Sequence, residues 1–178
     1  IKGVFQVVSM ATTTGFATAD FNSWPLFLPY VLLYAAIIGA CAGSTGGGMK
    51  VIRILLIFKQ GFREVQRLIH PRAVIPIKLG GQRVSDRIVE SVWGFFAVYV
   101  MVFLIMLLAL LATGLDIVTA FSAVGACINN LGPGLAEVAV TYGQLPAAAK
   151  WILCFAMLLG RLEIFTLLVL FTPMFWKR

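Results

Sequence analysis

Charged residues are scarce in this chain, and its few ionisable groups form no recognisable catalytic or metal-binding cluster. Asp, Glu, Lys and Arg make up 12% of the 178 residues, about half the share of a soluble domain, while hydrophobic residues make up 61%. The single histidine, His70, lies alone in a basic stretch. No Ser–His pair, paired Asp or metal cluster lies within the apolar segments, which disfavours an intramembrane enzyme. The composition indicates an integral membrane protein.

Paired cysteines and alternating strands are also missing. Cys41, Cys127 and Cys154 are dispersed in apolar surroundings without CxxC spacing, so we interpret them as small buried side chains and not as a disulfide or metal framework. The apolar runs have helical length and lack the ten-residue alternation of membrane barrels. The sequence begins without Met inside an apolar segment, and we expect it to belong to a longer polypeptide.

Positive charge is concentrated in one stretch. Nine of the fourteen basic residues fall between Lys50 and Arg87. The positive-inside rule places residues 59–87 in the cytoplasm, with Lys177 and Arg178 on the same side. No nucleic-acid recognition fold accompanies this charge, so we expect no nucleic-acid partner and a lipid bilayer instead.

Two short stretches share one pattern, Thr13-Thr14-Gly15-Phe16 and Asn130-Leu131-Gly132-Pro133. Each follows an apolar segment too short to cross a bilayer and precedes one that is long enough. The short segments cover 2–10 and 118–128, and the long ones cover 24–42, 88–113 and 146–176. Either stretch alone could be an ordinary interhelical turn; two at matched positions favour an internal repeat. With residues 59–87 cytoplasmic, both turns open to the outer face.

The chemistry of such turns suits a dehydrated cation. Backbone carbonyls on an extended segment can replace the water around potassium. Gly15 and Gly132 permit the unusual dihedral angles that aim successive carbonyls at one axis. The residues before each glycine would offer further carbonyls, and the short helices would present their negative carboxyl ends to the ion. We therefore predict a potassium filter, with no other metal.

A glycine-rich run lies inside the membrane sequence at Gly43-Ser44-Thr45-Gly46-Gly47-Gly48. It cannot continue a stable helix, since each glycine costs about 1 kcal/mol relative to Ala. The residues that follow lack the Gly-Lys-Ser/Thr of a phosphate-binding loop. Broken helix in a membrane is tolerated where it lines water, so we predict a flexible gate below the filter, the alternative being a plain kink. Arg161, in the middle of the last apolar run, should face the pore or a carboxylate.

These residues resemble the bacterial potassium uptake proteins of the Trk/Ktr/HKT superfamily, most closely the TrkH type. The resemblance covers essentially the whole chain. It is carried by SMATTTGFATADF (9–21), GACAGSTGGGMKVIRI (39–54), HPRAVIPIKLGG (70–81), INNLGPG (128–134) and GRLEIFTLL (160–168).

The resemblance implies an all-α integral membrane protein with helix–pore loop–helix repeats of potassium-channel-like architecture and broken second helices. Residues 1–58 would be the third repeat without its first helix, 59–87 a basic cytoplasmic linker, and 88–178 the fourth repeat. Gly39 aligns with Gly160, so the glycine run corresponds to the family's gating loop and Arg161 to its pore-facing arginine.

The resemblance also implies partners and a location. The family forms homodimers that bind a cytosolic, TrkA-like nucleotide-binding ring, and we expect Lys50, Arg53, Lys59 and Arg63 to face that ring. Nucleotide would bind only the partner, and no covalent cofactor is implied. The location implied is the bacterial inner membrane, crossed several times.

The function implied is potassium uptake, with the alternative of a non-conducting scaffold or assembly subunit. Channel-like and proton-coupled transport both stay open. The fourth turn carries Asn130-Leu131 where the third carries Thr13-Thr14. This imperfect symmetry predicts looser selectivity than in a tetrameric potassium channel.

Overall fold

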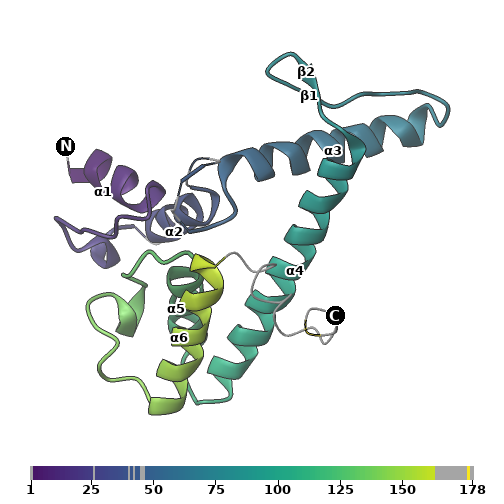
Figure 1. Ribbon diagram of the computed structural model, residues 1–178. Coiled ribbons are helices and arrows are strands. Elements are labelled where there is room, and N and C mark those ends of the chain that lie inside the picture. The colour runs from purple at the N-terminus through teal and green to yellow at the C-terminus, as the bar shows by residue number, and fades with distance from the viewer. Residues whose placement is uncertain are drawn as a thin grey trace.

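Helices dominate the computed structural model, which describes residues 2–25, 27–39, 41, 43, 44, 47–162 and 176 (Figure 1). The α-helices are α1 (Lys2–Ala11), α2 (Leu28–Ile38), α3 (Val51–Ile69), α4 (Asp86–Leu111), α5 (Ile117–Ile128) and α6 (Ala147–Arg161). Two 3₁₀ turns, η1 (Phe21–Ser23) and η2 (Ala136–Val138), and one hairpin, β1 (Lys78–Leu79) with β2 (Gln82–Arg83), complete the described elements.

The two short helices predicted before the glycine turns are confirmed as α1 and α5, and the long helix after the basic stretch as α4. The start of α5 has a local cause. Asp116 is its N-cap, and the carboxylate accepts a hydrogen bond from the backbone amide of Val118 at 3.0 Å. Apolar segment length therefore predicted these helices to within about two residues.

Other boundaries differ from the sequence prediction. Helix α3 runs on to Ile69 and so crosses the boundary predicted after residue 58, between the third repeat and the basic linker. Exposed apolar side chains keep helical spacing on both sides of residue 58, so one amphipathic helix continues across it, and only the residues of its polar face become more charged. They are Leu55, Phe58, Phe62 and Val65. Helix α6 ends at Arg161; the rest of the predicted apolar run, 163–175, lies outside the described residues.

Helix α5 forms the centre of the fold. It contacts α4, α6 and α2, and Figure 1 shows it beside α6 and between the other two elements. Small side chains permit this close packing: Ala120, Ala123 and Ala126 have no exposed surface. Helix α1 packs against α2, and α5 packs against α6, so each short helix contacts the α-helix that follows it in the chain.

Helix α4 is the only described helix both long and apolar enough to cross a membrane. Little of it is covered by the rest of the chain. Its exposed side chains are large and apolar, with Met101, Leu104, Ile105 and Leu108 each more than half exposed. A core helix of a soluble protein would bury these side chains, so this surface fits contact with lipid or with further membrane helices.

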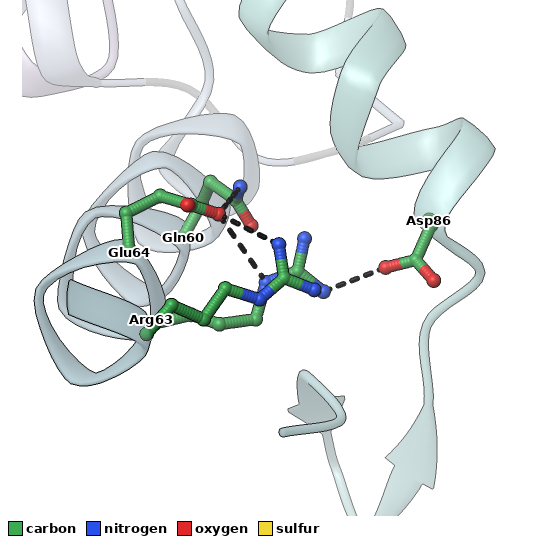
Figure 2. Close-up of polar contacts among 5 residues, drawn as sticks. Gln60, Arg63, Glu64 and Asp86 are labelled. Carbon is green, nitrogen blue, oxygen red and sulfur yellow. Dashed lines mark hydrogen bonds and ion pairs between the residues drawn. The ribbon is translucent and has the colours of Figure 1, made fainter. Parts of the chain in front are cut away.

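An ion pair joins α3 to the first turn of α4. The guanidinium of Arg63 donates to the carboxylate of Asp86 at 2.6 Å, with Glu64 and Gln60 beside it on α3 (Figure 2). The Arg63 side chain is only 7% exposed. Within the described residues, the Arg63 guanidinium therefore pairs with Asp86 of α4, and the expectation that Arg63 faces a partner stays a prediction.

Two more of the expected partner-facing residues make contacts within the chain. The Arg53 guanidinium lies 4.1 Å from the ring centre of Phe95 on α4, a cation–π contact. The Lys59 ammonium donates to the carbonyl of Lys78 in the hairpin at 2.5 Å. Both stay partly exposed, as does Lys50. The basic stretch is therefore a folded unit built on α3, and not an open loop.

Candidate functional site

The short helices α1 and α5 end in the same backbone motif. Thr13 and Asn130 each adopt a left-handed conformation with φ of 54°. In both turns the next amide donates to the carbonyl five residues earlier, 2.9 Å to Ser9 O and 2.9 Å to Ala126 O. Such a bond defines a Schellman motif, which closes a helix with a left-handed residue. Asn tolerates this conformation, whereas the β-branched Thr13 is strained in it.

A second left-handed residue follows two positions later in both turns. Gly15 has φ of +78° and Gly132 has φ of +105°. The residue between the two left-handed positions has negative φ in each case. When the sign of φ alternates along three residues, consecutive carbonyls can point to the same side of the chain. Each change of sign reverses the rotation of the next peptide plane. The unusual dihedral angles expected at both glycines are thus present.

The two turns lie against each other although they are far apart in sequence. A Cβ built on Gly15 would overlap the backbone carbonyl oxygen of Leu131 and lie 3.2 Å from Cδ of Pro133. Gly15 is therefore required twice, by its dihedral angle and by the approach of the second turn. The contact places the turn at residues 13–16 directly against the turn at residues 130–133.

Two further glycines hold the helix ends in equivalent ways. A Cβ on Gly39 would overlap the carbonyl oxygen of Ala11, the last residue of α1. A Cβ on Gly160 would overlap the carbonyl oxygen of Ile128, the last residue of α5. The helix after each turn thus returns to the carboxyl end of the short helix before it, which fits the pairing of Gly39 with Gly160.

Side chains fix the third-repeat turn from within α1. The Ser9 hydroxyl donates to the carbonyl of Phe16 at 2.6 Å. The Thr12 and Thr14 hydroxyls lie 2.8 Å apart on the exposed side of the turn. Gln6, fully buried, donates from Nε2 to the carbonyl of Ala19 at 2.9 Å. The chain leaving the turn is thereby tied back along the short helix.

The fourth-repeat turn is held by more distant elements. The Asn130 side chain donates from Nδ2 to the carbonyl of Met157 on α6 at 3.2 Å. The Tyr142 hydroxyl, from the loop after η2, donates to the carbonyl of Gly132 at 2.7 Å. The side-chain nitrogen of Asn130 therefore holds the turn against α6.

The glycine run lies directly against the end of α5. A Cβ on Gly47 would overlap the backbone carbonyl of Asn129, and Gly48, with φ of +88°, lies over the Asn129 side chain. Asn129 has no exposed surface; its Nδ2 donates to Gly125 O at 2.6 Å, and its Oδ1 accepts from the Tyr99 hydroxyl at 3.1 Å. Close approach, not only flexibility, explains glycine at these two positions.

The rest of the predicted gate is less fully described. The amide of Ser44 donates to the carbonyl of Cys41 at 3.0 Å in a turn, and a Cβ on Gly43 would meet no atom within 4 Å in the part of the chain that the structure describes. Thr45 and Gly46 lie outside the described residues.

Arg161 and the fourth-repeat turn line one cavity of about 580 Å³ between α5 and α6. Asn130, Leu131 and Gly132 form the wall opposite α6. Arg161 is exposed at the carboxyl end of α6, where the helix dipole favours a cation.

Sequence reasoning missed four residues: Ser9 and Tyr142 bind the candidate turns, and Asn129 and Tyr99 form the buried contact beside the glycine run. Ser9 and Asn129 lie inside the recognised motifs but were not predicted as site residues. Tyr99 and Tyr142 lie in other segments, and no spacing connects them to the turns. Only the fold shows these contacts, because each depends on how a neighbouring element packs.

Comparison with known proteins identifies the family. The model of the cation transport protein family TrkH matches residues 1–178, the whole chain. The chain belongs to the TrkH family. Within it, the Trk system potassium uptake protein TrkH of Halomonas elongata is 63% identical over 98% of this chain and 36% of that protein. The protein of the same name from Escherichia coli K12 is 61% identical over 99% of this chain and 36% of its own length.

A solved TrkH structure shares the fold. The crystal structure of the potassium transporter TrkH from Vibrio parahaemolyticus matches with a TM-score of 0.92 and 59% identity, covering 99% of this chain and 38% of that one. The chain thus spans little more than a third of the length of its TrkH relatives. The family and the fold together indicate that the chain is a membrane protein. The family is one of transport proteins and not of enzymes.

Proposed function

We propose that this chain supplies two of the filter segments of a potassium uptake pathway, residues 13–16 and 130–133. The observation that carries the proposal is the pair of matched Schellman turns with left-handed glycines, packed against each other at Gly15 and Leu131. The name of the relatives, potassium uptake proteins, supports potassium as the substrate.

Ion binding in this proposal depends on the backbone. Thr13, Thr14, Gly15 and Phe16 in one turn, and Asn130, Leu131, Gly132 and Pro133 in the other, offer carbonyl oxygens that can replace the hydration shell of potassium. The carboxyl ends of α1 and α5 add negative partial charge beside them. In the full-length protein, further segments would complete the ring. The repeats would be residues 1–58 and 88–178, helix–pore loop–helix units joined by the basic linker 59–87.

Gating belongs to the same proposal. The run Gly43–Gly48 would form a constriction at the base of the filter, which the contact of Gly47 with Asn129 supports. Arg161 would add a positive charge to the pore, and its place on one cavity with the fourth-repeat turn supports this role.

Regulation and location follow the family expectation. A homodimer in the bacterial inner membrane would bind a cytosolic, TrkA-like nucleotide-binding ring at the basic linker, through the partly exposed Lys50, Arg53 and Lys59. The filter turns would open outward. Potassium would be substrate, and nucleotide would bind only the partner.

A selectivity measurement tests the filter assignment. Replacing Gly132 with Ser places a side chain at φ of +105°, which costs about 1–2 kcal/mol unless the turn relaxes. We expect the full-length variant in liposomes to admit sodium better relative to potassium, because a relaxed carbonyl can approach a smaller ion. Unchanged selectivity would count against the assignment. Absence of rubidium uptake by the unmodified protein would favour a non-conducting scaffold instead.

A further inference from the structure

We propose that Tyr142 is a specificity-determining residue of the ion pathway, because its hydroxyl holds the Gly132 carbonyl in place. The inference rests on the proposed function, in which that carbonyl faces the ion. It adds a residue ten positions beyond Gly132 and outside the motifs recognised in the sequence.

The contact has the geometry of a strong neutral hydrogen bond. The Tyr142 oxygen lies 2.7 Å from the Gly132 oxygen, the usual distance for an O–H donor. The ring of Tyr142 packs against the main hydrophobic core, so the side chain is fixed at its base and at its tip. A Cβ on Gly134 would lie 3.5 Å from the same hydroxyl, which places this oxygen close over the backbone that leaves the turn.

The loop that carries Tyr142 is itself anchored on both sides. Before it, Val138 is fully buried, and its carbonyl accepts from the amide of Gly134 at 3.0 Å. After it, the Lys150 ammonium of α6 donates to the carbonyl of Gly143 at 2.7 Å. Because the loop is already anchored, the Tyr142 hydroxyl loses little further conformational entropy when it binds the Gly132 carbonyl. The position of that carbonyl therefore depends on the rigidity of the loop.

A second anchor holds the chain between the turn and this loop. The Ser122 hydroxyl of α5 accepts from the amide of Leu135 at 3.0 Å and lies 3.3 Å from the carbonyl of the same residue. Both Ser122 and Leu135 are buried. The backbone from Gly132 to Leu135 is therefore fixed to α5 as well as to Tyr142.

This hydrogen bond from Tyr142 to Gly132, here called the clamp, disfavours the binding of sodium more than that of potassium. A smaller ion requires the surrounding carbonyls to move inward, and inward movement of the Gly132 oxygen would stretch its bond to Tyr142. The hydrogen bond from the Tyr142 hydroxyl also draws electron density away from the ion, so the Gly132 oxygen attracts a cation less strongly. Among the described residues, the third-repeat turn shows a different arrangement, since the Ser9 hydroxyl donates to the carbonyl of Phe16, one residue beyond the glycine. The clamp therefore restrains the backbone of the fourth-repeat turn in a way that, within the described residues, the third-repeat turn is not restrained.

The test is Tyr142→Phe in the full-length protein reconstituted in liposomes, with rubidium uptake measured against rising sodium. We expect the preference for rubidium to fall by about two- to tenfold, the range set by the net strength of one hydrogen bond. Tyr34→Phe removes a hydroxyl from a side chain that is 55% exposed on α2 and should leave the preference unchanged. Lys150→Gln, which loosens the loop but keeps the hydroxyl, should shift the preference in the same direction by less.

The outcomes separate this inference from the proposed function. If Gly132→Ser changes the ion preference and Tyr142→Phe does not, the role of Tyr142 is refuted while the filter assignment stands. If neither variant changes it, both fail. Should Tyr142→Phe not fold, Lys150→Gln decides: an altered preference supports the clamp, and an unaltered one overturns it.

Discussion

Replacing Gly15 with Ala is expected to reduce rubidium uptake by at least about tenfold, more than the same change at Gly132. At both positions an L side chain is strained by about 1–2 kcal/mol, because φ is positive. Only at Gly15 would the new Cβ also overlap a backbone atom, the carbonyl oxygen of Leu131. Since that atom is a candidate ion ligand, the overlap would push the two turns apart.

Gly132→Ala is the matched control, because a Cβ there would meet none of the described atoms within 4 Å. Both variants would be assayed as full-length protein in liposomes, with size-exclusion chromatography and thermal unfolding to compare their folding. The structural account requires the larger loss at Gly15. Equal uptake by the two variants, both folded, would show that the contact between the turns has no part in transport.

Gly47→Ala is expected to raise basal uptake measured without a cytosolic partner by about fivefold, the effect of about 1 kcal/mol on a two-state equilibrium. A Cβ at this position would overlap the backbone of Asn129, so the glycine loop could no longer lie against the end of α5. If that seated loop is the closed gate, its displacement favours the open state.

Gly43→Ala provides the control within the same run. Its new Cβ would meet no atom of the described residues within 4 Å, and its φ lies outside the left-handed region, so uptake should stay at the basal level. Basal uptake by Gly47→Ala that stays low, in a folded protein, would remove the loop from the gate. A rise in both variants would point to general flexibility of the run instead of the contact with Asn129.

The sequence was sufficient to locate the elements that carry the candidate site. Apolar length separated the short helices α1 and α5 from α4, because a segment of ten residues cannot span a bilayer. Glycine in a fixed place after each short helix indicated left-handed backbone, which Gly15 and Gly132 adopt. These features depend on local chain properties, and a local pattern is enough to predict them.

Features that depend on neighbours could not be predicted. The hydropathy change after Phe58 hid the continuation of α3, because the buried contact of Arg63 with Asp86 makes a charged residue part of the helix packing. Nothing near Tyr142 indicates that it reaches Gly132. Likewise, the requirement for glycine at 47 comes from Asn129, which is distant in sequence.

The measurement that tests the central claim most directly is a crystal structure of the full-length protein with rubidium, whose anomalous scattering locates the ion. The account predicts a rubidium peak coordinated by carbonyl oxygens from both turns, residues 13–16 and 130–133, next to the contact of Gly15 with Leu131. A peak elsewhere in the pathway, with none at the turns in a protein that transports rubidium, would contradict it.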